Sequence, residues 1–121
     1  DILFANEEEA LALFEVQSVE KVVEMIKAWG GVAALTRSDK GCVIVHGGQT
    51  HEIQTAPVAK VVDTTGAGDQ FAAGFLYGLT HGKPLPDCGK LGAIAAAEVI
   101  SHFGARPEVS LKELAAKEGL I

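Results

Sequence analysis

A seven-residue run in the middle of the chain, DTTGAGD at 63–69, limits the possible folds more than any other feature. It follows a segment rich in β-branched residues and precedes a long apolar stretch, 71–79, whose large side chains recur at helical spacing. Consecutive small residues let a ligand approach the backbone closely, and the amides at the start of a helix favour an anion. The run is therefore predicted to be either a phosphate-binding turn or a simple flexible turn with an aspartate cap.

Strands and helices are mixed along the rest of the chain. At 18–29, for example, valine and isoleucine recur at i, i+3, i+4 and i+7, which predicts an amphipathic helix. The expected strands cover 2–5, 32–36, 42–46, 50–55 and 58–63, and the expected helices start at Asn6 and cover 18–29, 71–79, 87–102 and 110–119. This mixture predicts a layered α/β domain.

Composition narrows the classes of function. The chain has 121 residues, 48% of them hydrophobic, which is enough for one domain with a buried core. Its 16 acidic and 10 basic residues give a net charge of −6, which argues against nucleic-acid binding. Cys42 and Cys88 lack the spacing of a zinc site and are expected to be buried thiols. We expect a cytoplasmic protein, because there is no apolar membrane span and no basic signal region.

Asp69 closes the 63–69 run and is the candidate general base. A carboxylate at the mouth of a phosphate-binding turn can accept the proton of an attacking hydroxyl while backbone amides hold the phosphoryl group. A strong resting base is not required for this role, because phosphoryl transfer passes through a loose transition state.

The 63–69 run and the following Gln-Phe-Ala-Ala-Gly-Phe at 70–75 resemble the second signature of the ribokinase-type (PfkB) carbohydrate and nucleoside kinases. The resemblance extends over essentially the whole chain. It implies a ribokinase-like three-layer α/β/α fold and phosphorylation of a hydroxyl of a small sugar or nucleoside by ATP with Mg²⁺. In that pattern Asp69 would be the catalytic base, and Gly66, Ala67 and Gly68 would form the anion hole.

Asn6 and Glu9 look like the N-x-x-E motif of the same family, which serves magnesium and phosphate binding indirectly through water. The same spacing is that of a helix capping box, in which each residue bonds the backbone of the other. Both interpretations can hold at once.

The segment from Thr36 to Gly41 is similar to the family's T-x-G-x-x-G turn, which wraps the nucleotide. Ser38 stands where the middle glycine is expected, so the shape of the turn is open. Arg37 and Lys40 are either nucleotide contacts or surface charges.

Further ligand positions follow from the resemblance alone. Asp63 and Thr65 correspond to positions that hold a monovalent cation, such as potassium, in many relatives. Backbone oxygens after the alanine-rich helix complete that site, and the matching residues are Val99, His102 and Gly104. Gly92 and Ala96 match the wall on the adenine side of ATP, although small residues in a helix also serve plain packing.

The chain starts at Asp1 and runs directly into an apolar strand. Residues 1–121 match the carboxy-terminal, ATP-binding and catalytic-base portion of such kinases, without the amino-terminal portion that grips the acceptor and forms the lid. We therefore expect a segment of a larger enzyme, of the adenosine or sugar kinase type, that is inactive in isolation and forms a homodimer when complete. The alternatives are a nucleotide-binding module without catalysis and an α/β interaction domain.

Overall fold

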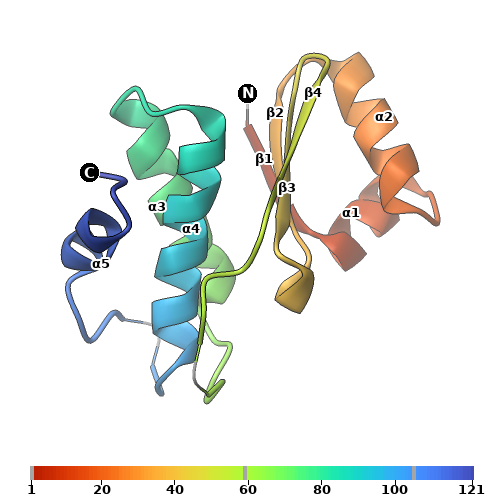
Figure 1. The fold of residues 1–121 in the computed structure, drawn as a ribbon. Helices are drawn as coiled ribbons and strands as arrows, with labels where there is room; N and C mark the ends of the chain where they lie inside the picture. The colour runs from red at the N-terminus through yellow and green to blue at the C-terminus, as the bar shows by residue number, and fades with distance from the viewer. Residues whose placement is uncertain (1, 59, 105) are drawn as a thin grey trace. The chain divides into compact units, whose positions relative to one another are not determined.

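The computed structural model describes residues 2–58, 60–104 and 106–121. The chain divides into two compact units, Asp1–Ile53 and Gln54–Ile121. The first holds a sheet and the second holds a group of helices (Figure 1). Strands and helices are thus both present, which confirms the predicted α/β class.

The sheet of the first unit has the strand order β1-β2-β3-β4. Its strands are β1 (Ile2–Asn6), β2 (Val32–Thr36), β3 (Cys42–His46) and β4 (Gln49–Ile53). The later pairs are antiparallel and joined by short turns, whereas β1 and β2 are parallel. A parallel pair needs a long crossover, and here α1 (Glu7–Phe14) and α2 (Val19–Trp29) supply it.

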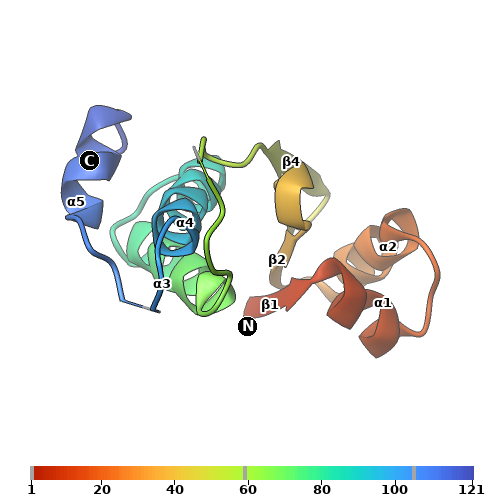
Figure 2. The same cartoon turned by 90° about the horizontal axis from the view of Figure 1, so that it is seen from below.

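One face of this sheet carries the core of the first unit. Figure 2 shows α1 and α2 on the same side of the strands. Side chains alternate along a strand, so every second residue of β2 and β3 points to these helices. The buried residues of this cluster are Ala10, Val22, Ile26, Ala33, Leu35, Val43 and Val45. Packing against this core fixes the ends of β1 and β2, where two of the predicted motifs lie.

The second unit is built on a close pair of helices, α3 (Ala67–Thr80) and α4 (Leu85–Ile100), followed by α5 (Leu111–Lys117). Glycines bring the two backbones into contact. A Cβ atom added to Gly74 would lie 2.6 Å from the Leu91 carbonyl oxygen, and one added to Gly92 would lie 2.8 Å from that of Phe71. Gly74 in α3 and Gly92 in α4 are therefore required by this close approach, which explains why the two helices accept residues of low helix propensity at these positions.

The strand predicted at 58–63 is wrong. The described residues of 54–64 form neither strand nor helix. The amides of Val62 and Asp63 instead donate to the carbonyl oxygen of Ile100 at the end of α4, with N–O distances of 2.8 and 3.3 Å. The β-branched residues of this segment predict a strand, but its amides donate to the end of a helix instead of to a neighbouring strand.

Helix boundaries also differ from the predictions. α3 begins at Ala67 rather than at 71, so the Gly-Ala-Gly run reaches into the helix. α4 begins at Leu85 rather than 87 and ends at Ile100 rather than 102. The earlier start is physically reasonable, because a proline fits the first turn of a helix, where its missing N–H costs no bond.

The cysteines are free and buried, as predicted. Burial raises the pKa of the Cys42 thiol to about 12, which keeps it protonated and unreactive. Within 2–58, 60–104 and 106–121, no group of three or more His, Cys, Asp or Glu side chains is arranged to hold a metal ion. None of the helices in these ranges has the length and apolarity needed to cross a membrane.

Candidate functional site

The turn that precedes α3 is ordered by Asp63. Its Oδ1 atom accepts hydrogen bonds from the Thr65 amide at 3.0 Å and from the Thr65 hydroxyl at 2.7 Å. Gly66 then takes a left-handed conformation, with φ of 81°, and caps α3 without a side-chain bond. This conformation suits glycine because an L side chain at positive φ is strained. The hydrogen bonds of Asp63 and the left-handed Gly66 therefore fix the direction in which the chain enters α3.

The start of α3 presents amides to the outside. The Ala67 amide donates to the Thr64 carbonyl oxygen at 3.2 Å, whereas in the described part of the chain no acceptor is found for the Gly68 and Asp69 amides. A Cβ atom added to Gly68 would meet nothing within 4 Å, so the space beside it is open. The Asp69 side chain is exposed in the first turn of the helix. Open amides beside a carboxylate can bind an anion and accept a proton.

The residues predicted for a monovalent cation converge at the end of α4. The side chain and backbone of Thr65 lower the pKa of Asp63, and a backbone hydrogen bond from Gly104 and the charge of His102 lower it further. Val99 is buried in the last turn of α4. The structure thus brings Asp63, Thr65, His102 and Gly104 into one neighbourhood. Their predicted role as cation ligands stays a prediction.

Glu98 is a polar residue that the sequence motifs do not indicate. It is 8% exposed and is the buried charged side chain of the described residues. Its Oε1 and Oε2 atoms lie 2.8 and 3.0 Å from His102 Nε2, and both accept from the Glu108 amide at 3.2 Å. The available sequence signal was the i,i+4 spacing of Glu98 and His102, which places two side chains together on a helix.

The His102 ring is held at both nitrogens. Nδ1 lies 2.9 Å from the Phe103 carbonyl oxygen while Nε2 faces Glu98. The hydrogen bond to Phe103, and next the one to Glu98, raise the pKa of His102. Two acceptors are both satisfied when the ring carries two N–H groups, so this arrangement favours the imidazolium form.

In the first unit, Asn6 and Glu9 form the predicted capping box of α1. The Asn6 side chain accepts from the Glu9 amide at 2.7 Å, and the Glu9 side chain accepts from the Asn6 amide at 3.0 Å. The structural interpretation of this motif is confirmed. The role of the two residues toward magnesium and phosphate stays a prediction.

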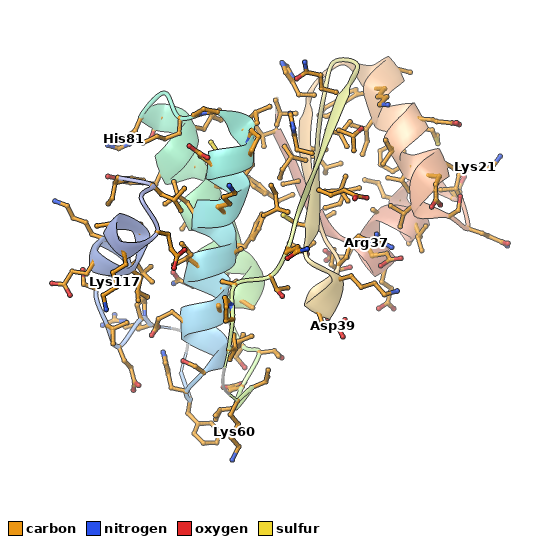
Figure 3. All side chains as sticks on the ribbon, in the orientation of Figure 1. Lys21, Arg37, Asp39, Lys60, His81 and Lys117 are labelled. Carbon is orange, nitrogen blue, oxygen red and sulfur yellow. The ribbon has the colours of Figure 1, made fainter. Side chains whose placement is uncertain are left out.

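The turn after β2 lies next to this capping box. Asn6 and Thr36 are register partners at the ends of the parallel strands β1 and β2. Arg37 reaches back to α1, where its Nε atom lies 3.4 Å from Glu7 Oε2 (Figure 3). Arg37 is thus at least an ion-pair partner, and its contact with a nucleotide stays open. The turn closes through the Arg37 amide, which donates to Gly41 O at 2.7 Å.

Ser38 takes a left-handed conformation with a φ of 56°, a region that glycine adopts without strain. A left-handed conformation costs an L residue roughly 1–2 kcal/mol, of which glycine's greater freedom in the unfolded chain cancels about 0.5–1. We therefore expect Ser38→Gly to raise the free energy of unfolding by up to about 1 kcal/mol. Urea denaturation measures it. The neighbouring Asp39→Gly, at ordinary φ, should lower stability instead, and equal effects of the two variants would contradict this account.

Gly92 and Ala96 lie on α4. Gly92 is pressed against the backbone and ring of Phe71, so its small size is required by helix packing. Ala96 is half-buried. The structure thus supports the packing interpretation of Gly92, and the contact of both residues with ATP stays a prediction.

Comparison with known proteins gives a consistent result. Residues 1–112 match the model of the family described as "pfkB family carbohydrate kinase". A cytidine kinase of Thermococcus kodakarensis is 38% identical over 107 residues, which cover 86% of this chain and 38% of that protein. The crystal structure of a probable sugar kinase from Rhizobium etli CFN 42 matches with a TM-score of 0.96 and 49% identity, over 100% of this chain and 37% of the other.

An adenosine kinase from Sinorhizobium meliloti also matches, with a TM-score of 0.93 and 45% identity, over 98% of this chain and 36% of the other. A fructokinase from Vibrio cholerae O395, solved with fructose, ADP and a calcium ion, is similar at 28% identity, with a TM-score of 0.79, over 87% of this chain and 36% of that one. The chain therefore spans just over a third of the length of these proteins, and the expected ribokinase-like fold is confirmed.

Proposed function

Because this chain belongs to the pfkB family of carbohydrate kinases, we propose that it takes part in phosphoryl transfer from ATP to a hydroxyl of a small sugar or nucleoside. The observation that carries the proposal is the turn before α3, where Asp69 stands beside open amides and an open space at Gly68. We further propose that residues 1–121 are the carboxy-terminal, ATP-binding and catalytic-base portion of a longer kinase. The similar proteins exceed this chain in length by more than twofold, which supports this assignment.

In the proposed reaction the acceptor oxygen attacks the γ-phosphorus, the bond from that phosphorus to ADP breaks, and the hydroxyl proton passes to Asp69. The amides of 66–68 would hold the negative charge of the transferred group. Of these, the Gly68 amide is open, whereas the Ala67 amide is engaged with Thr64. Gly68 is therefore expected to contribute more than Ala67.

ATP and magnesium are the proposed cofactors. Asn6, Thr36 and Gly41 are the ATP-binding residues proposed for the first unit. Those proposed for the second unit are Gly68 and Asp69 at the start of α3 and Gly92 and Ala96 on α4. Glu9 uses one carboxylate oxygen for the Asn6 amide, which leaves the other free to bind a water molecule of a hydrated Mg²⁺. The metal would neutralise the charge of the phosphates.

A monovalent cation such as potassium is proposed beside this turn. Asp63 offers a carboxylate, and Thr65, Val99, His102 and Gly104 offer backbone carbonyls, which are the oxygen donors that hard cations take. The ring of His102 is bound at both nitrogens, so its contribution would come from the backbone.

The acceptor is proposed to be a purine nucleoside or a sugar. Similar proteins include adenosine, cytidine and sugar kinases, so the names of relatives do not select one acceptor. We also propose that the complete enzyme is a homodimer.

The test is ATP turnover by the full-length protein that contains this chain. ADP release is measured with magnesium and, in turn, adenosine, cytidine, ribose and fructose, and the product is identified by ³¹P NMR. Acceptor-dependent ADP release supports the proposal. ATP binding without turnover on any acceptor would favour the non-catalytic nucleotide-binding module, and no ATP binding at all would favour an interaction domain. Turnover by the isolated 121 residues would contradict their expected inactivity.

Gly68→Leu should weaken binding of Mg-ATP by more than about tenfold, which corresponds to about 1.4 kcal/mol. The added side chain would fill the open space beside the amide, where the phosphate is proposed to lie. Isothermal titration measures the affinity. Gly48→Leu is the matched control, because Gly48 is also exposed with nothing near its Cβ position but lies in the turn between β3 and β4. Unchanged affinity of Gly68→Leu would remove this turn from the ATP site.

A further inference from the structure

Glu98 is a buried carboxylate that the proposed reaction does not use. Burying a charged group is costly unless hydrogen bonds replace its hydration. Here the compensation comes from His102 and from the Glu108 amide, so both partners lie beyond the end of α4. The Glu98 carboxylate therefore forms its hydrogen bonds with the segment that follows α4 rather than with groups of its own helix.

The segment that Glu98 holds, 101–108, has no helix or strand among its described residues. Its anchors are polar: the Ser101 hydroxyl donates to the Glu98 carbonyl oxygen at 2.5 Å, His102 lies against the Glu98 carboxylate, and the Glu108 amide donates to the same carboxylate. Glu98 thus contacts residues near both ends of 101–108, and a glycine lies between them.

That glycine, Gly104, connects the loop to the turn before α3. The Gly104 backbone lies close enough to Asp63 to lower the pKa of that carboxyl, and Asp63 in turn accepts the Thr65 amide at the entrance of α3. Asp63 is also tied to α4 directly through Ile100. Contacts therefore lead from Glu98 to His102, from His102 and Gly104 to Asp63, and from Asp63 to the turn that precedes Gly68 and Asp69.

We infer that Glu98 is a positioning residue for phosphoryl transfer: through loop 101–108 it fixes Asp63, and so the direction in which Gly68 and Asp69 face the transferred group. The inference rests on the proposed function. Displacement of reacting groups by about 1 Å can lower a rate by about a hundredfold, so a residue that touches no substrate can control kcat.

The test compares Glu98→Ala with Glu98→Gln in the full-length protein, using the acceptor on which it is active. Glu98→Ala should lower kcat by about tenfold to a hundredfold while changing the KM for the acceptor less than about threefold. Glu98→Gln keeps an oxygen that accepts from the Glu108 amide and should restore kcat to within about threefold of the parent. Glu118→Ala removes an exposed glutamate of the same unit and should leave kcat unchanged.

Amide hydrogen exchange supplies a readout that does not depend on activity. Glu98→Ala should speed exchange in 101–108 and also in 62–69, whereas Glu118→Ala should not. An active parent whose Glu98→Ala variant keeps its kcat, or whose 62–69 amides keep their protection, would overturn the inference and leave the proposed function standing. A parent without phosphoryl transfer on any acceptor would overturn the proposed function, and this inference with it.

Discussion

Replacing Asp69 with asparagine in the full-length protein should lower kcat by about two orders of magnitude or more, the scale of general-base catalysis. Asparagine has nearly the same size and hydrogen-bonding reach but cannot accept the proton of the acceptor hydroxyl. The side chain is exposed in the first turn of α3, so the change should not disturb packing. Binding of ATP should stay largely intact, because backbone amides are proposed to hold the phosphates.

Steady-state kinetics and titration with Mg-ATP together check this prediction. Asp87→Asn is the matched control, because Asp87 is the acidic residue in the first turn of α4 as Asp69 is in that of α3. It should leave kcat within about twofold, since only a small helix-dipole effect is lost. Undiminished turnover in Asp69→Asn would remove Asp69 as the base, and loss of ATP binding in that variant would assign it to nucleotide binding instead.

Gly74→Ala should lower the free energy of unfolding by about 1–3 kcal/mol, the cost of overpacking a tight interior. The new methyl group would stand 2.6 Å from the Leu91 carbonyl oxygen and 2.9 Å from Gly92 Cα. These are backbone atoms, so no side-chain rotation relieves the clash and the helices must separate.

Gly68→Ala makes the same chemical change in the same helix and should have the opposite sign. Its Cβ position is open, so the gain is that of helix propensity, up to about 1 kcal/mol. Urea denaturation of the two variants and the parent measures both effects. Equal stability of the two variants would contradict the close contact of α3 with α4.

Local patterns predicted much of the fold because local forces decide it. The helix at 18–29 follows from valine and isoleucine spacing, and the capping box of Asn6 and Glu9 from two residues three apart. The strand predicted at 58–63 is wrong, because valines that match a strand pattern also occur in irregular segments. What decided the outcome was an acceptor at Ile100, far along the chain.

The candidate site likewise has residues that could be predicted from the sequence and residues that could not. The turn at 63–69 is readable because its small residues and its aspartates are contiguous. The sequence left the shape of the turn at Ser38 open, and the structure gives this serine a left-handed φ of 56°, which local propensity does not predict. Glu98 was not predicted because its role depends on a contact between distant parts of the chain. The Glu108 amide lies eight residues beyond the end of α4 at Ile100, yet it donates to Glu98 inside that helix.

The glycine contact between α3 and α4 has a mechanical consequence. At Gly74, where the backbone of α3 meets the backbone of α4, the contact has no side-chain rotamers to rearrange and cannot absorb displacement by repacking. We therefore expect α3 and α4 to move together as one rigid unit. Movement of the start of α3 is therefore expected to carry α4 with it, and we expect the irregular segments at the ends of the two helices to take up any change that accompanies ligand binding.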